Sequence, residues 1–247
     1  MIQSIIVAFS MYSKIPMPRI KWNKKNMRYA LCFFPLVGVV IGMVEYGGFL
    51  FCQKMHMGTL FIACCQTLLP VFITGGIHLD GYLDTVDALS SYGDREKKLE
   101  ILKDSHAGAF AILYGIVYFV TSIGIWSEIK KEALPFICIG YLCSRTLSGF
   151  SVATFPLAKK TGLAATFQDQ AHKRNVKLVM LSLFLIESVL LLLLDWKRGS
   201  LVIMSCLVCF FLHYYICKYK FGGITGDLAG FFLQVCELVI VASMLVG

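Results

Sequence analysis

Long apolar stretches set the strongest constraint on how this chain can fold. Hydrophobic residues make up 57% of its 247 residues, only 15% are charged, and the mean hydropathy is +0.73. These values lie far from the composition of a water-soluble domain. Because a helix needs about 20 apolar residues to cross a bilayer, the sequence predicts an all-α, polytopic integral membrane helical bundle of about seven transmembrane helices. The candidate spans are approximately residues 29–52, 59–77, 109–127, 133–153, 177–194, 200–217 and 229–247.

Nothing in the sequence divides these spans into separate units. It contains no convincing internal repeat and no low-complexity linker, so we expect a single membrane-embedded domain over residues 1–247. The ten cysteines lie almost entirely within apolar runs. We interpret them as small apolar side chains in a reduced setting, without a disulfide or metal role.

Lysine and arginine are concentrated in alternate loops. The loops at 1–28, 78–108, 154–177 and 218–228 hold 17 of them, and the opposite loops hold 5. Because positively charged loops stay in the cytoplasm, we expect a multi-pass protein of the cell membrane whose first set of loops faces the cytoplasm. The net charge of +8 then reflects orientation and attraction to the lipid bilayer. No motif indicates nucleic-acid binding.

Three aspartates stand close together on that loop face. Asp80, Asp84 and Asp87 are spaced i, i+4 and i+7, which places them within roughly 60° on one side of a helix. Three neighbouring carboxylates repel one another, and beside hydrocarbon they also lack water, so the arrangement calls for a cation. Oxygen ligands of this kind suit Mg²⁺. We therefore predict a magnesium site, with a solvated acidic helix face as the alternative.

Other polar segments belong to the same loop face. The sequence Gly222–Asp227 places Thr225 and Asp227 near the start of the last span, where free N–H groups and the helix dipole favour phosphate. Lys160 adds positive charge after the fourth span. Acidic groups for a metal, together with N–H and basic groups for phosphate, are what group transfer from a diphosphate requires.

Four of the polar residues have more than one reading. Asp104 and Asp227 could each cap the helix that follows. His78 lies about 160° around a helix from the aspartates, so it would not share their metal; a substrate hydrogen bond and an interfacial histidine fit it equally. Arg145 lies inside an apolar span, where we expect an inward-facing role in preference to snorkelling.

The chain resembles the cobalamin synthase family, the adenosylcobinamide-GDP ribazoletransferases. The most specific part of the resemblance is the string G-G-I-H-L-D-G-Y-L-D-T-V-D, and the segments 9–18, 103–105 and 223–227 support it. Two positions depart from the pattern of that family. Ala88 stands where glycine is usual, and His106 stands where arginine is common.

The resemblance implies a Mg²⁺-dependent enzyme. It would transfer the adenosylcobinamide phosphate of adenosylcobinamide-GDP to α-ribazole or α-ribazole 5′-phosphate, releasing GMP and forming adenosylcobalamin or its 5′-phosphate. Asp104 or Asp227 would complete the metal shell or orient and deprotonate the attacking hydroxyl, and Gly81 would let a bulky substrate approach the backbone. The expected substrate-binding residues are His78, Gly81, Ser105, Arg145, Lys160 and Thr225. The expected partners are the two substrates and the bilayer; formation of a homo-oligomer is left open.

Three other functions fit parts of the pattern. A membrane cation transporter would use intramembrane acids as an ion pathway, but the acids gather at one face without a matching set near the midplane. A phospholipid head-group phosphotransferase would share the D-x-x-D spacing of Asp84 and Asp87, without the Ala-Arg that follows in that family. A purely structural membrane anchor leaves the acid cluster unexplained.

Overall fold

Helices make up nearly all of the regular structure. The computed structural model describes residues 1–104, 106–159 and 161–246, and apart from one isolated bridge between Leu157 and Ile224 its described elements are helical. They are α1 (Ile2–Tyr12), α2 (Lys24–Met27), η1 (Ala30–Phe33), α3 (Phe34–Lys54), α4 (Thr59–Thr74), α5 (Ile77–Ser90), α6 (Arg95–Ile101), α7 (Ala109–Glu128), η2 (Lys131–Ala133), α8 (Leu134–Thr154), α9 (Leu163–Gln170), α10 (Lys173–Leu194), α11 (Trp196–Tyr215), η3 (Ile216–Phe221) and α12 (Gly226–Ser243).

Six of the described helical segments are long and apolar enough to cross a membrane, and the bent pair α4–α5 makes a seventh if it is counted as one span. Helices α7 and α10 expose large apolar side chains along their outer faces, among them Ile116, Val120, Leu185 and Val189. Such faces are stable against lipid tails and unfavourable in water. The prediction of an all-α, multi-pass membrane bundle is confirmed.

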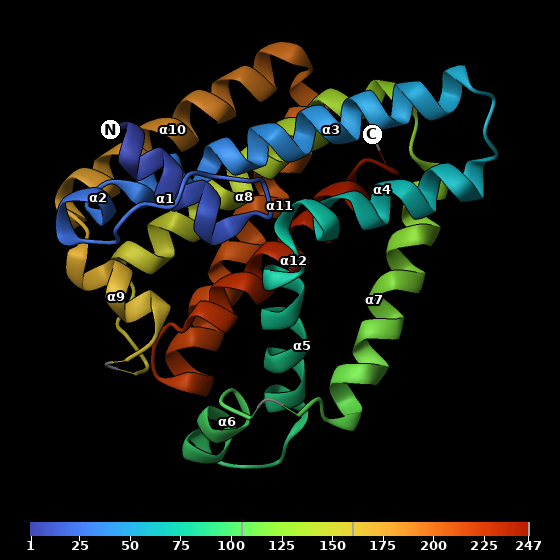
Figure 1. The fold of residues 1–247 in the computed structure, drawn as a ribbon. Coiled ribbons are helices and arrows are strands. Elements are labelled where there is room, and N and C mark those ends of the chain that lie inside the picture. Colours follow the sequence, from blue (N-terminus) through green and yellow to red (C-terminus); the bar gives the residue numbers. More distant parts are fainter. Residues whose placement is uncertain (105, 160, 247) are drawn as a thin grey trace.

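Helix α8 forms the centre of the bundle. It packs against α3, α10, α11 and α12, and most of its residues are buried. Figure 1 shows α3 and α4 running side by side across one part of the molecule, with α8 behind them. Two apolar clusters fill the interior. The larger contains Ile41, Ile137 and Ile240, and the smaller contains Met180 and Phe221.

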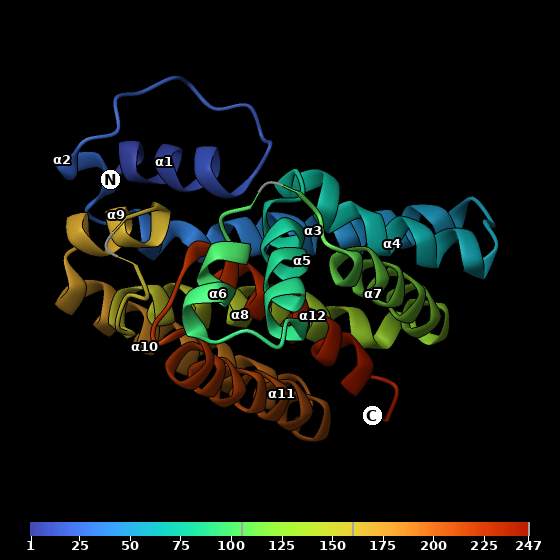
Figure 2. The same ribbon diagram turned by 90° about the horizontal axis from the view of Figure 1, so that it is seen from below.

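The second predicted span, 59–77, ends earlier than expected because the chain turns there. Helix α4 stops at Thr74, and Gly75 and Gly76 follow with φ angles of 66° and 78°. Glycine adopts this left-handed region without steric cost. The axes of α4 and α5 consequently differ by 99°, and in Figures 1 and 2 α5 stands nearly perpendicular to α4, between α6 and α7 when viewed from below.

Helices α5 and α12 approach each other closely through glycine. A Cβ atom at Gly81 would lie 2.7 Å from the carbonyl oxygen of Asp227, and one at Gly230 would lie 3.0 Å from that of His78. A side chain at Gly81 would overlap the main chain of α12, and one at Gly230 would fit only if α5 shifted by a few tenths of an ångström. The expectation that a bulky substrate approaches Gly81 is wrong, because the main chain of α12 occupies the space that a side chain at this position would take. Gly81 instead brings the acidic faces of the two helices together.

Candidate active site

An acid cluster forms where α5 meets the beginning of α12. Asp80, Asp84 and Asp87 lie on α5 as predicted, and Asp227 joins them from the first turn of α12. Asp84 is half-buried and within electrostatic reach of the other three carboxylates. Asp80 in turn acts on Asp227. The sequence predicted that the three α5 aspartates share one helix, and it offered Asp104 or Asp227 as the residue that joins them. The structure places Asp227 beside them.

Asp87 has a structural contact that the sequence did not reveal. Gly108 is the N-cap of α7 and has no side chain that could cap the helix. Instead, Oδ1 of Asp87 accepts a hydrogen bond from the N–H of Ala111 at 3.3 Å. A Cβ atom at Gly108 would overlap the Asp87 carboxylate. Asp87 therefore caps α7 from a neighbouring helix, which leaves Asp80 and Asp84 as the α5 carboxylates with no such helix-capping contact among the described residues.

Two loops from distant parts of the chain meet beside the cluster. Ile224 donates its N–H to the carbonyl of Pro156 at 2.7 Å and accepts from the N–H of Ala158 at 3.1 Å. This bridge places the half-buried Lys159 near Asp227. Burial lowers the pKa of Lys159 from its usual value, and the Asp227 carboxylate opposes that shift. The lysine predicted in this loop, Lys160, lies outside the described residues. Lys159 was missed because the two lysines are adjacent, and the sequence does not show which of them faces the aspartates.

Thr225 caps α12, which decides between two readings of Asp227. The hydroxyl of Thr225 accepts the N–H of Leu228 at 3.2 Å and donates to Oδ2 of Asp227 at 3.3 Å. Asp227 is thus not the cap of its helix. The buried Thr225 hydroxyl is engaged in this cap, and the predicted phosphate contact from Thr225 stays a prediction.

Asp104 lies in the exposed loop between α6 and α7. Its Oδ1 atom accepts the N–H of His106 at 3.0 Å and contacts the imidazole Nδ1 at 2.7 Å. These contacts hold the pKa of Asp104 below its usual value. Asp104 does not cap a helix, since α7 begins only at Ala109. Its neighbour Ser105, a predicted substrate contact, lies outside the described residues.

Arg145 faces inward, as expected, but it meets an acid of the same chain. Its Nη1 atom donates to Oε1 of Glu237 at 2.7 Å and to the carbonyl of Tyr141 at 2.9 Å. The two charged side chains are 1% and 7% exposed. The predicted substrate contact from Arg145 is therefore corrected: its charge is balanced inside the bundle, and it does not contribute to the lining of the cavity described next.

A cavity of about 310 Å³ opens beside the acid cluster. Asp80 and Asp227 contribute to its lining, together with His78 and mostly apolar side chains. His78 is 4% exposed, and its Nε2 atom has no hydrogen-bond partner among the described residues. A buried polar atom without a partner is costly unless a ligand or water satisfies it. The Nε2 atom is itself buried from solvent, so both readings of His78 stay predictions.

Comparison with known proteins assigns the family. A model of the cobalamin-5-phosphate synthase family matches residues 4–245. The chain belongs to that family. It is 45% identical over 238 residues to the adenosylcobinamide-GDP ribazoletransferase of Lachnoclostridium phytofermentans, covering 96% of this chain and 91% of that protein. The similarly named protein of Geobacillus thermodenitrificans is 30% identical over 242 residues, or 95% and 92% of the two chains. No solved structure matches.

The predicted family and its transferase class are thereby confirmed. The acidic side chains of this cobalamin-5-phosphate synthase family member can now be compared with the requirements of a metal site. Within 1–104, 106–159 and 161–246, no three His, Cys, Asp or Glu side chains are gathered as a preformed site. Mg²⁺ usually keeps several waters and binds one or two carboxylates plus substrate phosphates. The carboxylates of Asp80 and Asp84 would fit an ion of that kind together with substrate phosphates and water, and their mutual repulsion would fall when a cation neutralises them.

Proposed function

We propose that this protein transfers the adenosylcobinamide phosphate of adenosylcobinamide-GDP to α-ribazole or its 5′-phosphate. The family and the names of its relatives support this reaction. The observation that carries it is the convergence of Asp80, Asp84, Asp227 and Lys159 from three separate parts of the chain, beside a cavity that Asp80 and Asp227 line. Carboxylates for a metal and a lysine for phosphate are the groups that reaction needs.

In the proposed reaction, the ribose hydroxyl of α-ribazole attacks the phosphorus on the cobinamide side of the diphosphate. A new P–O bond forms, the bond from that phosphorus to the bridging oxygen breaks, and GMP leaves with the electron pair. Asp227 accepts the hydroxyl proton. Its place in the cavity lining favours it over the exposed Asp104. Lys159 stabilises negative charge on the phosphates.

Asp80 and Asp84 would hold Mg²⁺ together with the substrate phosphates. A bound ion of this type neutralises diphosphate charge and orients the leaving group. When no cation is present, the charges of the aspartates would repel the diphosphate of the substrate. Asp87 contributes by fixing the start of α7 next to the cluster.

We place this site on the cytoplasmic face of the cell membrane. The loop set around the acid cluster carries 17 of the Lys and Arg residues, against 5 in the opposite set, and such loops remain in the cytoplasm. The opposite loops come together at the other end of the bundle, where Gln53 and Thr59 share one surface hollow with Lys130 and Lys131. Alternate loops at opposite ends support a multi-pass topology.

The test is release of GMP from adenosylcobinamide-GDP by the purified full-length protein in lipid nanodiscs. We expect release only when α-ribazole and Mg²⁺ are both present, and its loss when EDTA removes the ion. The matched assay offers a CDP-alcohol in place of the cobinamide substrate. Turnover of the CDP-alcohol alone, or cation flux without GMP release, would contradict the proposal.

A further inference from the structure

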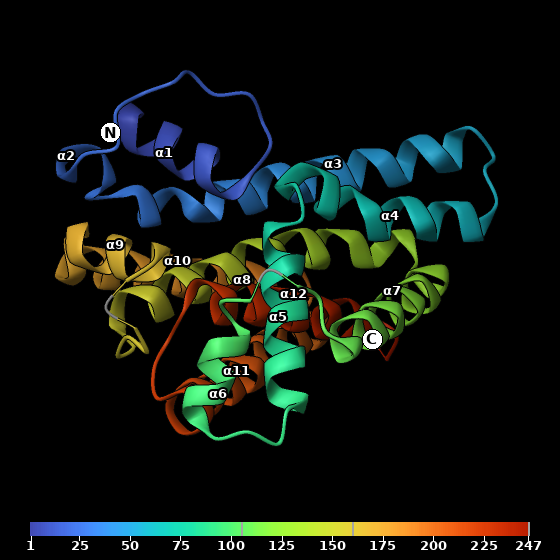
Figure 3. The same ribbon diagram turned by 60° about the horizontal axis from the view of Figure 1, so that its bottom comes forward.

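Eight lysine and arginine side chains with no part in the proposed reaction gather at one end of the bundle. Five belong to residues 19–28, which include α2, and three belong to the beginning of α10. All eight are exposed, and Figure 3 shows α2, α9 and the first turns of α10 close together at this end. We call this group the basic edge: Arg19, Lys21, Lys24, Lys25, Arg28, Lys173, Arg174 and Lys177.

Hydrogen bonds fix the main chain that carries the basic edge. Within the first segment, the side-chain amide of Asn26 donates to the carbonyl of Lys21 at 2.7 Å, and Asn23 caps α2 by accepting the N–H of Asn26 at 3.0 Å. Between the segments, the carbonyl of Arg28 accepts the N–H of His172 at 3.2 Å, and α10 begins at the next residue. Because the backbone is already held, binding an anion here costs little main-chain entropy.

Carboxylates do not balance the basic edge. Residues 1–44 contain no Asp or Glu, and no ion pair within 1–104, 106–159 and 161–246 includes any of the eight side chains. The acid nearest to the α10 segment along the chain is Asp169, an exposed residue of α9. Eight positive charges against this one negative charge produce a strongly positive surface, which attracts anions.

The α10 part of the basic edge lies at the end of a lipid-facing surface. Arg174 and Lys177 are within roughly 40° of Leu181 around the helix, and Leu181 is 48% exposed. Val176, on the other side of α10, is buried. Cationic side chains in this position extend along the helix toward the lipid headgroups. Trp22, which precedes α2 and is 45% exposed, is of the residue type that is enriched at the membrane interface.

We propose that the basic edge binds the headgroups of anionic phospholipids in the leaflet on its side of the membrane. Lysine and arginine form charge-assisted hydrogen bonds with phosphate oxygens, and each such residue near an anionic leaflet adds to the attraction. A soluble acidic protein would not require these charges on the same helix face as lipid-exposed leucines. The proposal goes beyond the proposed reaction and does not depend on it.

The first test compares two lipids in the absence of either substrate. Labelled phosphatidylglycerol is titrated with the full-length protein in a neutral detergent, and binding is measured by fluorescence anisotropy. Labelled phosphatidylcholine is the probe without net charge. We expect phosphatidylglycerol to bind about tenfold or more tightly than phosphatidylcholine. Added salt should weaken only the phosphatidylglycerol binding, because it screens exposed charges.

The second test locates the binding site with two triple variants of equal charge. The edge variant combines Lys25→Gln, Arg174→Gln and Lys177→Gln. We expect it to weaken phosphatidylglycerol binding about 100-fold, which corresponds to about 2.8 kcal/mol. The control variant changes three exposed lysines of the opposite loops and should stay within about threefold of the wild type. It combines Lys54→Gln, Lys130→Gln and Lys131→Gln.

A third variant keeps the charges and guards against a folding defect in the edge variant. It combines Lys25→Arg, Arg174→Lys and Lys177→Arg, and we expect it to bind phosphatidylglycerol within about threefold of the wild type. Equal weakening in the edge and control variants would show diffuse attraction and overturn the proposal. Equal affinity of the wild type for the two lipids, whatever the variants do, would overturn it as well.

A labelled polyglutamate peptide tests the alternative occupant. If the wild type binds this peptide more tightly than phosphatidylglycerol, the basic edge belongs to an acidic protein and the proposal is overturned. Because no substrate is present in these assays, a negative result leaves the proposed reaction standing. Failure to release GMP would in turn leave the lipid binding standing.

Discussion

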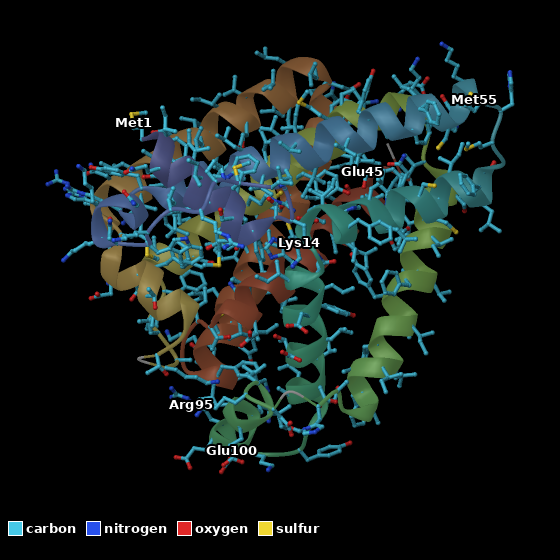
Figure 4. The ribbon with its side chains drawn as sticks, in the orientation of Figure 1. Met1, Lys14, Glu45, Met55, Arg95 and Glu100 are labelled. Carbon is cyan, nitrogen blue, oxygen red and sulfur yellow. The ribbon has the colours of Figure 1, made fainter. Side chains whose placement is uncertain are left out.

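The molecule holds carboxylates in two contrasting surroundings. Inside the bundle, Glu237 is paired with Arg145 at 2.7 Å and also accepts from Ser144 at 3.1 Å, and Glu187 accepts from Thr146 at 2.8 Å. In the middle of α5, Asp84 has other carboxylates as its electrostatic neighbours. Figure 4 shows the interior Glu45 on α3, apart from α5. Burial and rarity thus do not mark the site; several carboxylates gathered together do, with Lys159 as a cation near Asp227.

The largest expected effect comes from neutralising an acid of the cluster. Asp84→Asn should lower GMP release about 1000-fold, in the range for loss of an electrostatic or acid–base group, without lowering thermal stability, because like-charge repulsion is relieved. Asp169→Asn, which changes an exposed carboxylate on α9, is the control. Near-normal turnover of Asp84→Asn in Mg²⁺ would contradict a role for the cluster in the reaction.

The interior pair should show the opposite behaviour. Arg145→Met leaves Glu237 buried without its partner and should destabilise the protein by about 3–5 kcal/mol, measured by thermal or denaturant unfolding in detergent. The double variant Arg145→Met with Glu237→Met removes both charges and should recover most of that stability together with GMP release. A stable but inactive double variant would show that Arg145 serves the substrate after all.

Asp87 lies between the two kinds of carboxylate, and its expected effect is the smallest. Asp87→Ala removes the cap of α7 and should cost about 1 kcal/mol, whereas Asp87→Asn keeps a capping oxygen and should cost little. Both are measured as the midpoint of thermal unfolding. A capping role alone predicts that Asp87→Asn retains GMP release; loss of release at unchanged stability would return Asp87 to the predicted metal ligands.

The sequence predicted what depends on local pattern. Apolar runs of membrane length gave the helical class, and the i, i+4, i+7 spacing put Asp80, Asp84 and Asp87 on one helix. Paired glycines mark the place where the second span breaks, although the 99° angle could not be read from them. The aspartate spacing and the glycine pair each involve residues that are close together along the chain.

Contacts between distant segments escaped prediction because no local pattern encodes them. Arg145 and Glu237 are 92 residues apart, and Asp87 and Ala111 are 24 apart. Lys159 reaches Asp227 only because Pro156 and Ala158 bond to Ile224. In each case the charged residue can be read from the sequence, but its partner depends on how the helices pack.

The turn at Gly75 and Gly76 also bears on the depth of the acids. Figure 4 shows Lys14 at this turn, beside the beginning of α5, where its N–H bonds the carbonyl of Ile73 at 2.7 Å. Helix α4 has 16 residues, about 24 Å, which is less than the ~30 Å of a bilayer hydrocarbon core. We therefore expect the level of the carboxylates in a bilayer to be set by a helix that contains none of them. Membrane thickness would then govern how far a charged substrate descends to meet them.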